Sequence, residues 1–348
     1  MDQLSATLDR GWDLAQRGDA IGAAACAKRG LELDPKSPEV HNLLGYSAAM
    51  SGNPEDALEH YKQAIALDET YFEAMLNAAE VLMHPLGEWD DAVTMCDDAY
   101  ALAETDEEIA DCLLLKVDAL MSKGEMDDAM RVMRLIPEGP FESASYTFLI
   151  GRAYYELGDF ERASPLIEEA ARKDPTHADA QYYLGLVRDE RGDTRGATEA
   201  FLRARALDVG REPPSWAPSP DAFGTHVEGC IRKLDALLGR YIHEAEVFVV
   251  DVPGAELVVD GVDPRALMII DSPPPVSSPQ SGASGNEDGD AGRERRRCRI
   301  FVYQRNVERA AGTVEQLEDE ILAALEREIT AVFLEPDAAA KKETRHLN

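Results

Sequence analysis

The sequence predicts an all-α superhelical solenoid of helix pairs over its first two thirds, followed by a small α+β domain. Three observations predict this fold class. A glycine followed five residues later by an alanine recurs every 34 to 37 residues along the first part of the chain. A proline-rich stretch then interrupts the pattern at 212–220, and runs of β-branched residues typical of strands follow it.

The recurring glycines predict the turn inside each helix pair. They are Gly18, Gly52, Gly87, Gly124, Gly158 and Gly192, and their alanines are Ala23, Ala57, Ala92, Ala129, Ala163 and Ala197. Around Gly158, apolar residues at helical spacing lie on both sides of the turn, and glycine can adopt the left-handed conformation that ends a helix. One helix pair cannot bury its apolar face alone, so we expect six stacked units over residues 4–211.

These positions resemble the tetratricopeptide repeat (TPR) family, most clearly at 38–71 and 144–177. The resemblance implies a concave groove, formed by the first helix of each unit, in which partners bind. By position, this groove would be lined by Trp12, Asn42, Tyr46, Glu80, His84, Asp118, Arg152, Tyr155 and Tyr182. Arg152 is the one strong cation among them, so the groove suits a basic or amphipathic segment rather than a carboxylate. The alternative is that several of the aromatic residues only pack between neighbouring helices.

Residues 212–220 predict a linker, because their prolines remove hydrogen-bond donors and fix backbone torsions. The domain after it, residues 221–335, should contain a helix at 221–241, strands at 245–252, 257–259, 267–270 and 299–303, and a final helix at 313–334. Low hydrophobicity predicts a disordered insertion at 272–295, and we expect a flexible tail at 336–348.

This order of elements resembles the small bacterial zincin-like metallopeptidase family. The motifs that carry the resemblance are Asp251-Val252-Pro253, Asp263-Pro264-Arg265 and Arg305-Asn306. In that family the last helix carries H-E-x-x-H, in which two histidines bind zinc. Here Arg327 and Ala331 occupy the two histidine positions, and only Glu328 remains. Because arginine stays protonated and alanine has no donor atom, the resemblance implies a catalytically dead domain without metal or cofactor.

Charge and cysteine usage bound the function classes. The chain has 67 acidic and 35 basic residues and a net charge of -32, which excludes most nucleic-acid roles because such a field repels phosphate. The five cysteines lie far apart without a C-x-x-C pair, which favours a reducing compartment. The N-terminal residues show no secretory pattern, and no apolar run is long enough to span a membrane. We therefore expect a cytoplasmic protein without membrane insertion.

The leading hypothesis is a non-enzymatic interaction scaffold or adaptor. Its TPR groove would hold a partner segment, and its dead zincin-like domain would supply a second docking surface. The alternative is a metal-dependent peptidase or hydrolase with non-standard ligands such as Glu328, Asp271 or His346. A third possibility is a chaperone-like adaptor with a broad client set. Stoichiometric zinc in the purified protein would favour the hydrolase.

Overall fold

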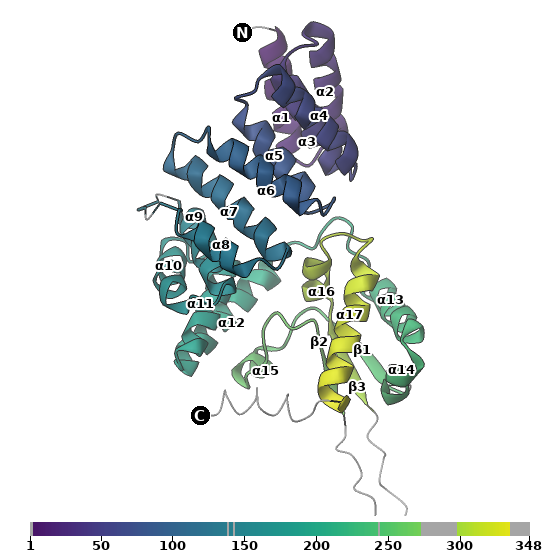
Figure 1. Ribbon diagram of the computed structural model, residues 1–348. Helices are drawn as coiled ribbons and strands as arrows, with labels where there is room; N and C mark the ends of the chain where they lie inside the picture. Colours follow the sequence, from purple (N-terminus) through teal and green to yellow (C-terminus); the bar gives the residue numbers. More distant parts are fainter. Residues whose placement is uncertain (1–2, 138, 142, 243, 273–297, 335–348) are drawn as a thin grey trace, which may run out of the picture. The chain divides into compact units, whose positions relative to one another are not determined.

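The computed structural model describes residues 3–137, 139–141, 143–242, 244–272 and 298–334 (Figure 1). The chain divides into two compact units, Met1–Lys173 and Asp174–Asn348. The boundary expected after residue 211 therefore lies inside the second unit, because the sixth helix pair packs with the C-terminal elements. Except for Ser272, the predicted insertion at 272–295 lies outside the described residues, as does the whole predicted tail at 336–348.

The first unit consists of helix pairs. They are α1 (Gln3–Gln16) with α2 (Ala20–Leu33), α3 (Pro38–Met50) with α4 (Pro54–Leu67), α5 (Phe72–Met83) with α6 (Trp89–Tyr100), α7 (Asp106–Ser122) with α8 (Met126–Met133), and α9 (Ala144–Glu156) with α10 (Phe160–Lys173). Each first helix also contacts the first helix of the next pair, from α1 to α9. This arrangement, visible in the purple-to-teal part of Figure 1, confirms the predicted solenoid of helix pairs.

The repeating glycines form the turns as predicted. All six have positive φ values, from +67° at Gly87 to +81° at Gly158. A Cβ atom built on Gly158 meets nothing within 4 Å, so the backbone conformation alone requires glycine there. Five residues later, Ala163 is 0% exposed, because the second helix closely approaches the first at this point.

The second unit begins with the sixth helix pair and continues through the C-terminal elements. They are α11 (Ala178–Glu190), α12 (Thr194–Gly210), α13 (Pro220–Lys233), α14 (Ala236–Ile242), β1 (Glu246–Val250), α15 (Ala255–Val259), β2 (Met268–Asp271), β3 (Arg299–Tyr303), α16 (Gln304–Ala311), α17 (Leu317–Ile329) and a π-helix at Thr330–Leu334.

The C-terminal strands form a three-stranded sheet in the order β1-β3-β2. Strand β1 runs parallel to β3, whereas β2 runs antiparallel to it. Residues Ile300 and Val302 lie in an apolar core with residues of α13 and α17, such as Phe223 and Leu325. Helices α13 and α17 contact each other and the sheet, and α17 is the long yellow helix of Figure 1.

One of the predicted C-terminal strands is a helix in the structure. The strand expected at 257–259 is the short helix α15, in which Val258 is buried and Leu257 N donates to Gly254 O. Gly261, with φ +97°, turns the chain directly after it. The segment packs against α12 instead of joining the sheet, which consists of β1, β3 and β2 in the described residues. Local β propensity is therefore overridden by tertiary packing.

The two long helices predicted in this domain are interrupted in the structure. The helix expected at 221–241 breaks at Leu234, whose backbone is extended, and Asp235 then accepts a hydrogen bond from Leu237 N at 2.7 Å. The final helix starts at Leu317 rather than 313, and its last turn is the π-helix from Thr330. Helix α16 was not predicted.

Candidate functional site

The predicted groove residues of the first unit lie on successive first helices. We call this side of the unit the first-helix surface and define it by Trp12, Tyr46, Glu80, His84, Asp118, Arg152 and Tyr155. Since each first helix contacts the next, residues at equivalent positions come close together. The Trp12 and Tyr46 rings, from α1 and α3, lie 5.3 Å apart edge to face, and Tyr46 is 36% exposed. This end of the surface therefore offers partly accessible aromatic area.

Carboxylates dominate the other part of the first-helix surface. Glu80 is exposed, and about one third of the Asp118 side chain is exposed. Arg152 Nη2 lies 3.7 Å from Asp118 Oδ2, and Arg152 Nε lies 3.5 Å from Glu156 Oε1. Burial raises the pKa of Asp118, although Arg152 opposes that shift. An additional cation would therefore stabilise a carboxylate that Arg152 does not fully compensate.

Asn42 was expected to line the groove but does not contribute to this surface. The residue is 2% exposed, and its amide donates to Tyr71 Oη at 3.2 Å while accepting from Asn77 Nδ2 at 3.0 Å. Its hydrogen-bonding groups thus serve contacts between the second and third helix pairs. The prediction placed Asn42 in the groove by helical position alone, which does not show whether a neighbouring helix covers the side chain.

Tyr182, the groove residue predicted on the sixth first helix, lies against the C-terminal domain. Its hydroxyl donates to Asp263 Oδ2 at 2.9 Å, and the Arg265 guanidinium carbon lies 4.4 Å from its ring centre. Both partners belong to the Asp263–Pro264–Arg265 loop. This part of α11 is therefore occupied by the protein itself.

Charged residues around this contact form what we call the junction cluster, defined by Asp179, Asp208, Arg265 and Arg309. Arg265 Nη2 lies 2.7 Å from Asp179 Oδ1, and Arg265 Nε lies 3.1 Å from Asp208 Oδ2. Arg309 Nη1 lies 2.8 Å from the same Asp208 oxygen. The side chains of Arg265 and Asp208 are only 13% and 9% exposed, so these ion pairs are largely shielded from water.

The two arginines of the junction cluster respond differently to this environment. Burial opposes the charge of Arg265, but Asp208 and Asp179 outweigh it and raise the pKa of Arg265. Burial and the nearby Arg265 lower the pKa of Arg309. Desolvation also works against an ionised Asp179, yet Arg265 lowers the pKa of that carboxyl. The cluster is therefore a set of mutually dependent charges, in which loss of one member leaves another uncompensated.

Backbone contacts complete the junction. Asn306, 2% exposed, donates to Pro264 O at 3.0 Å and Ala266 O at 2.7 Å and so holds the loop. Arg305 Nη1 donates to Val209 O at 2.9 Å and Arg211 O at 2.8 Å, carbonyls at the end of α12 that lack a helical partner. Each of the three motifs that suggested the zincin-like family meets α12 or α11, since Arg205 Nε also donates to Pro253 O at 2.5 Å. Sequence reasoning singled out these motifs but not this role.

The degenerate motif of the last helix assembles no comparable site. Arg327 Nε lies 3.5 Å from Glu328 Oε1, and Ala331 lies in the π-helix after α17. Asp271 pairs with Arg299, and His346 lies outside the described residues. Within the described part of the chain, no three histidine, cysteine or acidic residues are placed to hold a metal ion together.

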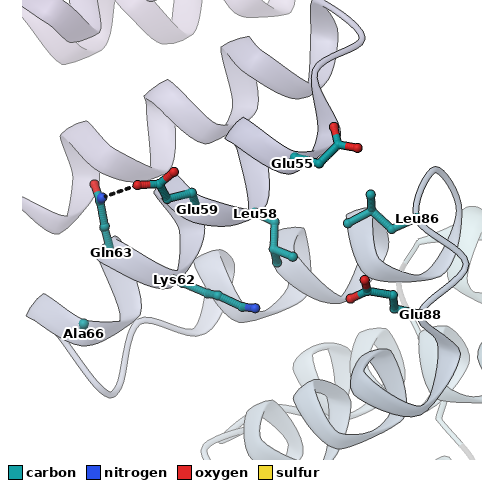
Figure 2. Close-up of a pocket in the computed structure, with 8 residues that line it drawn as sticks. All are labelled: Glu55, Leu58, Glu59, Lys62, Gln63, Ala66, Leu86 and Glu88. Atoms are coloured by element: carbon teal, nitrogen blue, oxygen red, sulfur yellow. Dashed lines mark hydrogen bonds between the residues drawn. The ribbon is translucent and has the colours of Figure 1, made fainter.

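A pocket of about 510 Å³ lies on the second-helix side of the first unit (Figure 2). Leu58 of α4 and Leu86, before α6, form its apolar part. Three carboxylates lie around them, and Gln63 Nε2 donates to one, Glu59 Oε1, at 3.2 Å. Lys62 also lines the pocket, so charges of both signs surround its apolar part.

Helix pairs closed by left-handed glycine turns define the class as an α-helical repeat protein. TPR family models match residues 8–72 and 148–211 and, in a second model, 48–111. The helix pairs within these ranges are therefore tetratricopeptide repeats. These matches end at residue 211, and the zincin-like nature of the C-terminal domain stays a prediction.

Solved structures share the repeat fold. PilF from Pseudomonas aeruginosa is 17% identical with a TM-score of 0.51, covering 60% of this chain and 93% of that one. PilW, described as a widely conserved type IV pilus biogenesis factor, is 15% identical with a TM-score of 0.51, covering 61% and 97%. At these identities the likeness concerns the fold alone. None of the curated proteins compared with the sequence matches it. Within the described ranges, no helix has the length and apolar character that crossing a membrane requires.

Proposed function

We propose that this protein is a non-enzymatic protein–protein interaction scaffold whose first-helix surface binds a basic or amphipathic partner segment. The observation that carries the proposal is the composition of that surface. Asp118 and Glu156 share one arginine, Arg152, while Glu80 is exposed, and partly accessible aromatic rings lie on the same row of helices. TPR proteins as a class present such helix faces to protein partners, which supports the same role.

Two physical terms favour such a partner. Apolar side chains of an amphipathic segment would bury area against Trp12 and Tyr46, whose rings already pack edge to face. Basic side chains would compensate the carboxylates, above all Asp118, whose pKa is raised by burial. The charge contribution should weaken with salt, because exposed charges are screened over ~8 Å at physiological ionic strength.

For the C-terminal domain we propose a docking role without catalysis. Glu328, the residue that would act on a zinc-bound water in the zincin-like family, lies beside the charge of Arg327. Asp271, a ligand of the hydrolase alternative, is paired with Arg299. The chemistry of these pairs supports structural roles for both carboxylates. All five cysteines are free thiols, which fits the proposed cytoplasmic location.

The proposal is tested by titrating the full chain with a synthetic amphipathic helical peptide of lysine and leucine, using isothermal titration calorimetry. A Tyr46→Ala, Tyr155→Ala variant and a Glu80→Gln, Asp118→Asn variant should each weaken binding about tenfold or more. The matched control is Glu32→Gln, Glu161→Gln, which removes two exposed carboxylates from the second helices α2 and α10. Equal weakening by the control would mean that overall charge, not this surface, binds the peptide.

A further inference from the structure

Strand β1 is an edge strand with an open groove beside it. In the sheet order β1-β3-β2, it pairs with β3 on one side only within the described part of the chain. A groove of about 520 Å³ follows it, lined by residues 247–250 of the strand and by one side of α13. An edge of this kind presents backbone N–H and C=O groups that another strand can use.

The two sides of this groove differ in chemistry. Helix α13 contributes Asp221, Gly224, Thr225 and Glu228, which the helical repeat places in one stripe, and both acidic residues are exposed. On the other side, Phe248 and Val250 are 40% and 41% exposed. Such exposure of large apolar side chains is unusual, because a sheet with one solvated face normally buries apolar residues on the other face and exposes polar residues to water.

The alternation along β1 explains why the groove has two chemistries. Val247 and Val249 pack toward the apolar core that includes α13, whereas Phe248 and Val250 point to the opposite face of the sheet. There Phe248 stacks on Phe301 of β3, with ring centres 5.2 Å apart. A strand added beside β1 would alternate in the same way, with one set of side chains near the acidic stripe and the other beside Phe248.

We propose that β1 binds an extended partner segment with alternating basic and apolar residues, which joins the sheet as an additional strand. The basic side chains would compensate Asp221 and Glu228, and the apolar ones would cover Phe248 and Val250. Gly224 leaves the room that the segment needs, since a Cβ built on it meets only Val249 Cγ2, at 3.6 Å. The inference rests on the proposed scaffold function, because it locates the second docking surface of that function.

A second copy of this chain fits the edge less well. Pairing of two β1 strands would bring the acidic stripe of each copy, together with Glu246, close to that of the other. Like charges that face each other across a strand pair are destabilising. A basic segment meets no such repulsion, so charge complementarity selects it as the occupant.

The test uses the full chain and a fluorescent ten-residue peptide of alternating lysine and valine, with binding followed by anisotropy. Gly224→Gln should fill the groove and weaken binding about tenfold or more. The matched control is Gly229→Gln on the same helix, which lies outside the groove and whose built Cβ meets only Arg232 Nη2, at 3.9 Å. The control should bind like the unchanged protein. Equal affinities for the two variants would overturn the proposal.

A second peptide separates strand addition from simple charge attraction. N-methylation of alternate backbone amides keeps every charge but removes ladder donors, and it should abolish binding. Retained binding of the methylated peptide would show that no strand is added. The Tyr46→Ala, Tyr155→Ala variant should bind the alternating peptide normally, so failure of this inference is distinguishable from failure of the first-helix surface. Concentration-dependent self-association that Gly224→Gln suppresses would point instead to a second copy.

Discussion

Arg265 lies over the ring of Tyr182, 4.4 Å from guanidinium carbon to ring centre, and the Tyr182 hydroxyl donates to Asp263 in the same loop. A residue of the last TPR unit that appears from sequence to face a partner is thus covered by the C-terminal domain of the same chain. The partner binding proposed for the first-helix surface therefore concerns the first unit, while the sixth helix pair contacts the C-terminal domain.

Arg265→Ala should destabilise the protein by about 3 kcal/mol, because it removes the close partner of Asp179 and leaves the buried Asp208 with Arg309 alone. Urea denaturation of the full chain measures the free energy of unfolding. The control Arg195→Ala removes an ion pair with Glu199 in which the arginine is 91% exposed, and should cost less than about 0.5 kcal/mol. A similar small cost for Arg265→Ala would mean that the junction cluster contributes little to stability.

Gly158→Ala should destabilise the first unit by about 1 kcal/mol, and Gly158→Val by somewhat more, since φ of +81° is unfavourable for any residue with a Cβ. The thermal midpoint of the full chain measures the effect. Gly210→Ala is the control, because its built Cβ also meets nothing within 4 Å but its φ is not positive. If both substitutions lowered the midpoint equally, backbone conformation would not be the cause.

Glu308→Gln should change how stability depends on pH. Burial raises the pKa of Glu308, which is 2% exposed. The folded state therefore favours the protonated carboxyl, and stability from this group is present below its unfolded pKa and is lost as pH rises through the folded pKa. The variant, whose amide is neutral throughout, should be at least as stable as the wild type at about pH 7 and should gain little on acidification toward about pH 4. Denaturation of the variant and the wild type at several pH values measures this effect. If the free energy of unfolding changed with pH equally in both proteins, the assignment to Glu308 would be contradicted.

Glu328→Gln should lower stability by no more than about 1 kcal/mol, because its ion pair with Arg327 is partly exposed. Metal analysis of the purified wild type should find no stoichiometric zinc. Both results would follow if Glu328 has no zinc-bound water to activate. One zinc per chain together with loss of cellular function in the Glu328→Gln strain would instead support the hydrolase alternative.

The solenoid was predictable because its signals are local and repeated. Gly158 is required by a left-handed turn, and Ala163 is required by the close approach of two helices. The same two requirements recur along the chain. The five-residue strand at Arg299–Tyr303 was also predicted with its observed limits. Helix α15 was missed because the local β propensity of Leu257 and Val258 favours a strand, whereas in the structure their segment packs against α12 as a helix.

The junction cluster could not be predicted in the same way. The cluster joins residues that are far apart in sequence, namely Asp179, Asp208 and Arg265. In the sequence, each of them is indistinguishable from an ordinary charged surface residue. Only the packing of α11 and α12 with the loop at Arg265 brings them together. The sequence contains only an indirect indication of the junction cluster. The Asp263-Pro264-Arg265 motif was recognised for its resemblance to another family, not for contacts with the repeat.

The sixth helix pair belongs to the repeat pattern by sequence and to the C-terminal domain by packing, and this limits how the chain can be cut or recombined. A fragment that ends at residue 211 would retain Asp208 and Tyr182 but lose Arg265, Arg305 and Arg309. A fragment that starts at 212 would carry those arginines without their acceptors. Whole units could be exchanged or duplicated within the first 173 residues with far less disturbance, so variation in the number of repeats in proteins of this architecture should occur upstream of the last pair.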